Sequence, residues 1–328
     1  MSKITKEILD PSIKRIEDAF TSKKNDVATK ELSALAQVIS KDFKNPCVEE
    51  RVNELTKIAT RIVRESSIEI EKLCVCDEKD YDAKKMISWG HLRVAALQIL
   101  TFLVCSEQRC VSLFPDCFDP VLDLLRSKSS KTDFVGTRVA CNIARNLVLP
   151  LKNRTEFWKA GALNVLLEHG CHKDPNISLA AIVTARQLAL NCDQALSEHM
   201  SASDIKSCAN SIDAFLKRDL KHTHPMVRAE FSRFLALLSV GVSKVFNKDK
   251  KMSPLHELFC EPRCIEFYCF LLASKSQALH IEALAALSAM RIMKSFDSSA
   301  YVGFLTRIKA TSGVSVKGRL DQLGIKYI

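Results

Sequence analysis

Apolar residues recur at helical spacing along most of this chain, with polar residues on the opposite faces. Between Val52 and Val63, for example, apolar side chains three and four residues apart form one stripe. Residues 1–75 are predicted to form two or three such amphipathic helices, which could cap the rest of the chain. The segment 76–86 is polar and charged, so we expect a loop and an internal boundary there.

Five later segments share a second pattern, in which small residues, mainly alanine, precede leucines three and four residues apart. These segments begin at His91, Gly136, Ile177, Met226 and Leu279. Small residues let neighbouring helices approach closely, and leucines fill a shared core. The five segments are therefore predicted to be equivalent long helices.

The spacing of these segments indicates a repeat architecture. One aligned position in each segment gives separations of 45, 41, 49 and 54 residues, measured between Arg93, Arg138, Leu179, Arg228 and Glu282. Periods of roughly 40 to 47 residues with two or three helices are typical of armadillo and HEAT arrays. We therefore predict an all-α, armadillo/HEAT-type right-handed superhelical repeat array, with about five units over residues 87–328.

One unit shows the armadillo pattern most clearly. A short first helix is expected over residues 153–160, Gly161 breaks it, and a second helix follows over residues 162–168. Gly170 is expected to end that second helix, because glycine is the preferred residue just past a helix end. An Asp-Pro-Asn turn then leads into the long third helix.

Charge and composition narrow the possible partners. The chain has a formal net charge of +10, which could attract nucleic acid, anionic lipid or an acidic protein face. The lysines are scattered, however, and no aromatic residues interleave with the densest runs at 126–131 and 248–251. The pattern favours lysines that solvate a helical array, so a nucleic-acid partner is not expected.

Cysteine usage and hydropathy suggest a reducing compartment. Thirteen cysteines are present, and no apolar signal segment opens the chain. We also expect no window of about 18 apolar residues. We therefore predict reduced thiols in a cytoplasmic or nuclear setting, with no transmembrane segment. No second C-x-x-C pair at structural-zinc spacing occurs, so no metal or other cofactor is predicted.

Catalytic motifs are also missing from the sequence. There is no G-x-x-x-x-G-K-[ST] phosphate loop and no G-x-S-x-G nucleophile elbow. Phe157 and Trp158, on the expected short first helix, are predicted to pack in the core between units. We therefore expect no covalent enzyme and no catalytic residues.

Three stretches resemble one known family. Residues 142–167 read NIARNLVLPLKNRTEFWKAGALNVLL, with an R-N-L-x-x-P-x-x-N-(K/R) run followed by A-G and a leucine-rich helix. Residues 226–239 (MVRAEFSRFLALLS) and 281–287 (IEALAAL) follow in the same order. Together they resemble the small-GTPase GDP-dissociation stimulator family (SmgGDS) over roughly residues 135–295.

This resemblance implies a regulator of small GTPases of the Ras and Rho type, possibly prenylated, acting as a guanine-nucleotide exchange stimulator or as a chaperone. Such exchange stimulation needs no covalent chemistry, since a protein that prefers the nucleotide-free GTPase shifts the equilibrium by differential affinity alone. Two alternatives stay open. The chain could be a scaffold or adaptor for unrelated proteins, or a basic array that contacts nucleic acid or an anionic membrane.

A partner-binding groove is predicted along the long third helices. Asn142 and Asn146 lie four residues apart and point the same way, and Gln187 takes an equivalent place in the next unit. Side-chain amides there can hydrogen-bond the backbone of an extended ligand. The alternative is that these polar residues only solvate a helix.

A second set of candidate residues is charged. Glu230, Arg233 and Glu282 match the family segments residue by residue, which implies pairing with a GTPase switch surface or with its basic tail. Contacts between repeats, or a solvated helix face, are the alternative for these three residues.

Overall fold

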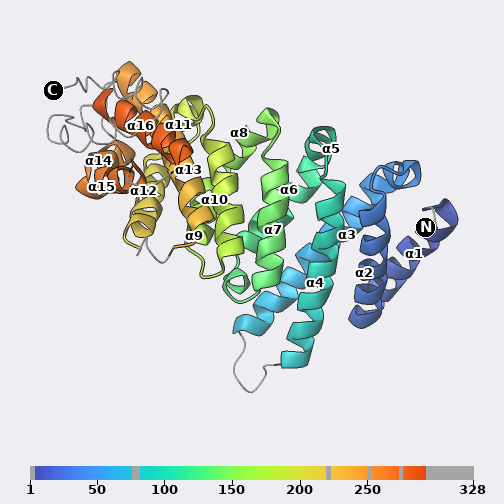
Figure 1. Ribbon diagram of the computed structural model, residues 1–328. Coiled ribbons are helices and arrows are strands. Elements are labelled where there is room, and N and C mark those ends of the chain that lie inside the picture. The colour runs from blue at the N-terminus through green and yellow to red at the C-terminus, as the bar shows by residue number, and fades with distance from the viewer. Residues whose placement is uncertain (1–3, 76–81, 219–222, 250–252, 273–275, 293–328) are drawn as a thin grey trace. The chain divides into compact units, whose positions relative to one another are not determined.

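The computed structural model describes residues 4–75, 82–218, 223–249, 253–272 and 276–292, and within these ranges the secondary structure is helical, with no strand. The chain divides into two compact units, Met1–Arg154 and Thr155–Ile328 (Figure 1). The α8 helix (Leu151–Lys159) spans the boundary between them.

The described residues of the first unit form seven α-helices and one 3-10 helix. These are α1 Lys6–Thr21, α2 Asn25–Lys41, α3 Pro46–Val75, α4 Ala83–Leu103, α5 Glu107–Ser112, α6 Phe114–Arg126, η1 Lys128–Lys131 and α7 Phe134–Leu147. The second unit follows the same plan. Its described helices are α9 Ala162–Gly170, α10 Pro175–Ala189, α11 Asp193–Glu198, α12 Ala202–Leu216, α13 Pro225–Asp249, α14 Pro254–Cys260, α15 Pro262–Leu272 and α16 Gln277–Ile292.

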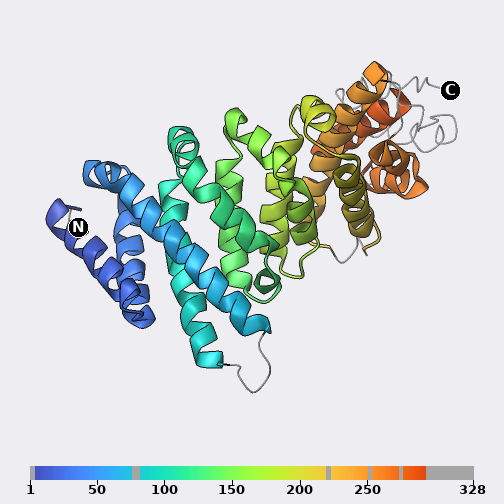
Figure 2. The ribbon, with the colours of Figure 1, turned by 180° about the vertical axis from the view of Figure 1, so that it is seen from behind.

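Helices of the first unit pack in two layers. The α2, α4 and α7 helices lie side by side in one layer, which faces the viewer in Figure 1. The view from behind in Figure 2 shows the other layer, in which α1, α3 and α6 pack in series. Each helix of one layer also contacts its sequence neighbour in the other, so apolar faces are buried between the layers.

The second unit repeats a three-helix motif, a short first helix, a second helix and a long third helix. The triplets α11–α12–α13 and α14–α15–α16 show it, and α10, α13 and α16 pack in series as third helices. All five segments singled out by the alanine–leucine pattern are long third helices, namely α4, α7, α10, α13 and α16. The widest separation, the 54 residues between Arg228 and Glu282, includes most of α13, which has 25 residues whereas α10 has 15.

Within the first unit, α2 belongs to the same layer as α4 and α7, which the sequence pattern did not show. The α2 helix packs on α4 as α10 packs on α13. The α4 helix begins at Ala83, inside the segment expected to be a loop, and residues 76–81 lie outside the described residues. A capping role for residues 1–75, and the boundaries drawn from sequence, remain predictions.

Two glycines mark the unit that was clearest in the sequence. Gly161 has φ +64°, a left-handed conformation that separates α8 from α9, as expected for a breaker. Gly170 does not follow the end of the second helix but lies in its last turn, where a Cβ atom would come within 2.4 Å of the Ile182 Cδ1 atom. Gly170 is therefore required by close helix packing and not by a left-handed cap.

Two aromatic residues of α8 are buried as expected. Phe157 and Trp158 are 2% and 4% exposed, so their rings belong to the core of the protein and not to an open ligand pocket. Both lie at the start of the second unit, where the short first helix contributes little other apolar surface.

The α4 helix is long and apolar enough to span a bilayer, by length and composition alone. The sequence was predicted to contain no such window, so α4 differs from that prediction. A core helix passes the same test, and half of the apolar window (50%) is buried in the structure, where α4 packs against α2, α3 and α7. Arg93 also lies within α4. One helix of this kind is weak evidence for a membrane span.

A buried arginine joins the two layers of the first unit. Arg93 on α4 has no exposed surface, and its Nη2 atom lies 2.6 Å from the Asp133 carboxylate. Its Nη1 atom donates hydrogen bonds to Ser67 on α3 and Ser129 on η1, at 3.3 and 3.2 Å. The same guanidinium group therefore contacts α3, η1 and the residue that precedes α7.

Asp133 connects this buried charge to the start of α7. Its second oxygen accepts a hydrogen bond from the Gly136 backbone N–H at 2.8 Å, which caps the helix. A Cβ atom at Gly136 would lie 2.1 Å from the Asp133 carboxylate. The glycine therefore leaves the space in which one carboxylate both caps α7 and neutralises Arg93.

Replacing Arg93 by methionine should strongly destabilise the chain. The substitution leaves the largely buried Asp133 carboxylate without its counter-ion, and we expect a loss of about 2–4 kcal/mol in the free energy of unfolding. Urea denaturation followed by circular dichroism measures this. The control is Arg138→Met on the exposed face of α7, expected to change stability by less than about 0.5 kcal/mol. Equal effects from the two variants would contradict the role assigned to Arg93.

Candidate functional site

The third helices of the first unit line a groove. Its volume is about 590 Å³, and α2, α4 and the start of α7 contribute its walls. Arg93 and Asp133, joined by their ion pair, form part of its lining, together with the polar residues Thr29 and Ser33 of α2. We call this feature the α2–α4–α7 groove.

Three large apolar side chains of this groove are exposed. Ile87 on α4 is 57% exposed, and Phe134 and Val135, the first two residues of α7, are 45% and 48% exposed. Because Asp133 caps α7, the Arg93–Asp133 pair also fixes where Phe134 and Val135 lie. A cluster of exposed apolar residues in a groove is typical of a protein-binding site.

Basic and amide side chains continue from this cluster along α7. Arg138, Asn142 and Arg145 lie on one stripe of the helix, three and four residues apart. Arg138 and Arg145 are exposed and form no ion pair with any residue in the described ranges. The exposed face of α7 is therefore positively charged and not neutralised.

The predicted amide ladder is divided between the two units. Asn142 and Asn146 are half-buried on α7, and neither side-chain amide hydrogen-bonds to another residue in the described part of the chain. Their amides are therefore available to a ligand. Gln187 is half-buried on α10 and belongs to the second unit. A continuous ladder through these three residues remains a prediction.

The charged candidates are brought together in the second unit. The Glu230 carboxylate on α13 lies 2.7 Å from Arg186 Nε on α10 and 2.6 Å from Arg233 Nη1. Arg233 Nε lies 2.6 Å from the Glu282 carboxylate on α16. Four alternating charges thus join three successive third helices.

Most of this network is shielded from solvent. The exposed fractions of the four side chains range from 15% for Glu230 to 35% for Arg233. The hydrogen bond to Glu282 raises the pKa of Arg233, while burial raises the pKa of Glu282 against the opposing effect of Arg233. This geometry matches contacts between repeats, the structural alternative considered for these residues.

Arg186, which begins the network, was not predicted from the sequence. The sequence places Arg186 on one third helix and an acidic residue on the next, but which charges pair depends on how the two helices pack.

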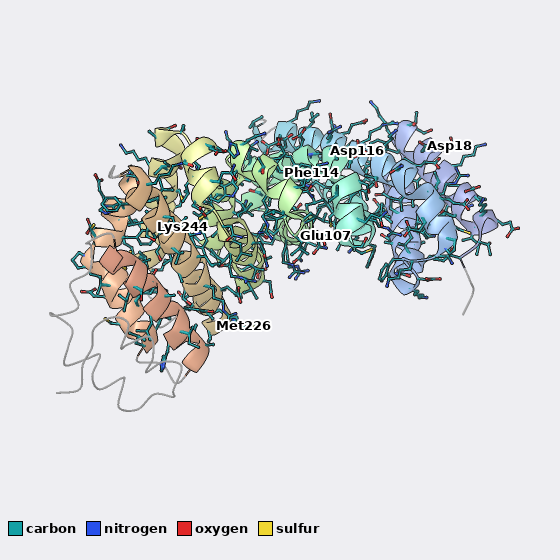
Figure 3. All side chains as sticks on the ribbon, turned by 90° about the horizontal axis from the view of Figure 1, so that it is seen from above. Asp18, Glu107, Phe114, Asp116, Met226 and Lys244 are labelled. Atoms are coloured by element: carbon teal, nitrogen blue, oxygen red, sulfur yellow. The ribbon has the colours of Figure 1, made fainter. Side chains whose placement is uncertain are left out.

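Figure 3 labels Met226 at the start of α13 and Lys244 towards its end. Lys244 lies 3.3 Å from Asp193 of α11.

The R-N-L-x-x-P-x-x-N-R run forms a helix ending. The Asn153 amide donates hydrogen bonds to the carbonyl oxygens of Leu147 and Cys110, at 2.8 and 3.0 Å. Arg154 donates to the carbonyl oxygens of Val148 and Leu149. These bonds satisfy the last carbonyl groups of α7, so this part of the family resemblance describes how a repeat is closed.

Six of the twelve described cysteines are buried, and all twelve are free thiols. Burial raises the pKa of Cys110 to about 11 and that of Cys117 and Cys141 to about 12. Thiols of this kind are poor nucleophiles. No cluster of three or more metal-ligating side chains occurs in the described ranges.

Comparison with known proteins finds similarity in the fold. A scan against family models and a search of the curated proteins found no match. Among solved structures, a designed armadillo repeat protein is 15% identical with a TM-score of 0.52, covering 81% of this chain and 94% of its own. Another, in complex with the peptide (KR)4, is 13% identical with a TM-score of 0.51, covering 79% and 98%.

A third similar structure is a computationally designed armadillo repeat protein for modular peptide recognition. It is 14% identical with a TM-score of 0.54, covering 79% of this chain and 99% of its own. The chain therefore has an all-α, armadillo-type repeat fold, which confirms the fold class predicted from sequence.

A double-mutant cycle should show that the charge network stabilises the second unit. Arg233→Met and Glu282→Gln are each expected to lower the free energy of unfolding by about 1–2 kcal/mol, and the double variant by less than their sum. Urea denaturation measures all three. Gln187→Ala, outside the network, serves as the control, and additive losses would show that the pair is not coupled.

Thiol labelling should follow burial. Exposed Cys105 is expected to react with iodoacetamide at neutral pH in the native protein, whereas Cys117, Cys141 and Cys208 should react only after unfolding, because burial raises their thiol pKa. Mass spectrometry of peptides after timed labelling measures each site. Rapid native labelling of Cys141 would contradict the packing described for α7.

Proposed function

We propose that this chain is a non-enzymatic binding protein that holds a segment of a protein partner in the α2–α4–α7 groove. The observation that carries this proposal is the cluster of Ile87, Phe134 and Val135, which are exposed around a groove of about 590 Å³. Burying such side chains against a partner contributes about 25 cal/mol per Å² of apolar surface removed from water.

The adjacent α7 stripe suggests how the partner is oriented. The unpaired guanidinium groups of Arg138 and Arg145 would attract carboxylates, and the amides of Asn142 and Asn146 could hydrogen-bond a peptide backbone. Similar structures support a peptide-binding mode, since one contains the peptide (KR)4 and another was designed for peptide recognition. The (KR)4 peptide is basic, whereas the segment bound by this chain would be acidic.

We further propose that the partner is a small GTPase of the Ras or Rho type. Support comes from the likeness of residues 142–167, 226–239 and 281–287 to the SmgGDS family. Several residues that carry this likeness also stabilise the fold. Asn153 closes a helix, and Glu230, Arg233 and Glu282 join third helices. The GTPase proposal therefore depends on sequence likeness, and a scaffold or adaptor for other proteins is the alternative.

Binding to the GTPase would act without covalent chemistry. If the groove holds the nucleotide-free form more tightly than the loaded forms, nucleotide release is favoured by that difference in affinity. A difference of about 1.4 kcal/mol between the two forms shifts their ratio tenfold. A chaperone role would instead require a difference between prenylated and unmodified forms.

A retention experiment tests the GTPase proposal. Ras- and Rho-type GTPases, each nucleotide-free, GDP-loaded or GTP-loaded and with or without a prenyl group, are passed over the immobilised full chain. Selective retention of one nucleotide or prenylation state is expected. Retention that is indifferent to both, or no retention of any GTPase, would reject the regulator and favour the scaffold.

The groove itself is tested by Phe134→Ser. Loss of this exposed ring is expected to weaken binding of a retained partner by at least about tenfold, because one anchoring side chain is removed. Stability should change by less than about 0.5 kcal/mol. Ile8→Ser, at an exposed apolar position on α1, is the matched control. Titration calorimetry with both variants separates the groove from non-specific apolar contact.

A further inference from the structure

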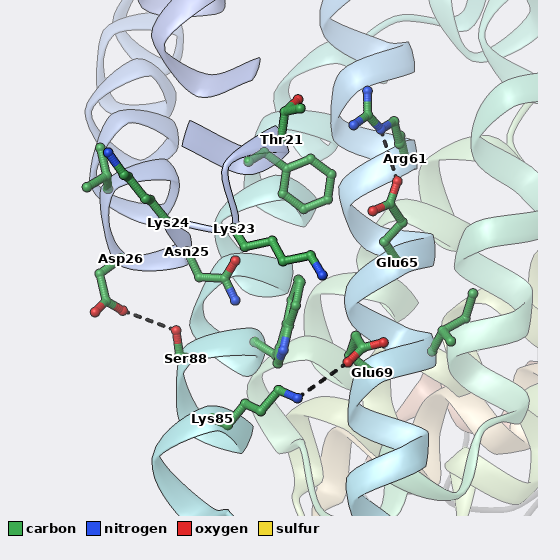
Figure 4. Close-up of a pocket in the computed structure, with 14 residues that line it drawn as sticks. Thr21, Lys23, Lys24, Asn25, Asp26, Arg61, Glu65, Glu69, Lys85 and Ser88 are labelled. Atoms are coloured by element: carbon green, nitrogen blue, oxygen red, sulfur yellow. Dashed lines mark hydrogen bonds and ion pairs between the residues drawn. The ribbon is translucent and has the colours of Figure 1, made fainter. Parts of the chain in front are cut away.

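A second and larger pocket lies in the first unit, where the turn between α1 and α2 approaches α3 and α4. Its volume is about 780 Å³ (Figure 4). We call it the Lys23 pocket, after the residue that extends across it from the turn. Its side chains come from all four helices, and none of the residues discussed as partner-binding candidates lines it.

The pocket combines two buried rings with exposed apolar edges. Phe20 and Trp89 are 5% and 8% exposed and meet edge to face at 6.5 Å between ring centroids. The Arg61 guanidinium lies over the Phe20 ring at 5.2 Å. Val27 on α2 and Ile68 on α3 also line the pocket and are about half exposed, so each offers apolar surface to an incoming side chain.

Two buried polar atoms in the walls have no hydrogen-bond partner. These are the indole Nε1 of Trp89, a donor, and the Oδ1 atom of Asn25, an acceptor. An unpaired buried polar group is unfavourable and is uncommon in folded proteins. A peptide carries both an acceptor and a donor of the kind that these two atoms lack.

Lys23 has an unusual backbone for a lysine. Its φ is +57°, and the Lys24 N–H donates to the Ala19 carbonyl at 2.8 Å, which is the geometry of a left-handed helix ending. Glycine normally occupies such a position, because a Cβ atom is disfavoured there. Lysine at this position keeps a cationic side chain over the pocket, as Figure 4 shows.

Positive charge exceeds negative charge by one in the pocket lining, where Lys23, Lys24, Arg61 and Lys85 lie with Asp26, Glu65 and Glu69. The Glu69 carboxylate lies 2.7 Å from Lys72 and 3.7 Å from Lys85. The hydrogen bond from Lys72 is the main cause that lowers the pKa of Glu69, and the Lys85 and Lys23 charges lower it further. One carboxylate thus faces three ammonium groups.

The other acidic residues of the lining have partners of their own. Glu65 is paired with Arg61 at 3.0 Å, and Asp26 accepts a hydrogen bond from Ser88 at 3.1 Å. Lys23 itself forms no ion pair within the described residues. Its ammonium group is therefore the cation available to an incoming carboxylate.

We propose that the Lys23 pocket binds an acidic peptide segment of a protein partner, with one apolar side chain against Val27 or Ile68 and one carboxylate on Lys23. The apolar edges, the unpaired peptide-type donor and acceptor, and the uncompensated ammonium group all match this ligand. Polyanions such as nucleic acid or anionic membranes lack the apolar side chain and match only the charge.

This site is distinct from the α2–α4–α7 groove. Lys85, Ser88 and Trp89 line the pocket, whereas Ile87 and Gly90 line the groove. Successive helix residues are rotated by about 100°, so these two sets occupy opposite faces of α4. The inference stands whether or not the groove holds a GTPase.

The test uses the full chain and a fluorescein-labelled peptide of glutamates with one phenylalanine and one leucine, followed by fluorescence anisotropy. Saturable binding is expected, and Lys23→Asn should weaken it by about tenfold, since one charge pair is lost. Asparagine tolerates the left-handed backbone, so this variant should fold at least as stably as the native chain. Lys30→Gln, an exposed lysine of α2 outside the pocket, should bind normally.

Further arms decide the ligand class. A peptide with glutamine in place of glutamate, and a peptide of glutamates alone, should each bind at least about tenfold more weakly. Phe134→Ser, in the groove, should leave binding unchanged, which separates this site from the proposed function. No saturation up to millimolar peptide, equal binding by Lys23→Asn, or stronger Lys23-dependent binding of heparin or phosphatidylserine vesicles would each overturn the proposal.

Discussion

The ion pair between Arg93 and Asp133 is the contact on which the rest of the first unit depends. A guanidinium group without exposed surface is tolerated only because its charge and donors are largely matched by one carboxylate and two serines. The same carboxylate begins α7, and α7 begins with the exposed apolar residues of the groove. Core stability and the presentation of the binding surface therefore share one interaction.

The two units hold their third helices together by different means. In the first unit a single buried centre joins α3, α4, η1 and the start of α7. In the second unit a shielded chain of charges passes from α10 through α13 to α16. In both units the charges are paired with partners instead of being buried alone.

The sequence predicted the helices better than the site. The alanine–leucine pattern located all five later third helices, because periodic burial is a local property. It missed α2 as a member of the same layer and placed Gly170 just past the helix end instead of at the last residue of α9, where it packs on Ile182, because both depend on packing against another helix. The groove was missed for the same reason, since Ile87 and Phe134 are far apart in sequence and become neighbours only when Asp133 fixes α7.

The position of Arg93 in the chain also constrains how the protein is made. Arg93 precedes Asp133 by 40 residues, so the ribosome releases the guanidinium group first. At about 5–20 residues per second, several seconds separate the two. Until Asp133 emerges, closing α3 over α4 would bury an unpaired charge. The nascent N-terminal helices should therefore stay loosely packed during this interval, and a chaperone that acts co-translationally would have its best access then.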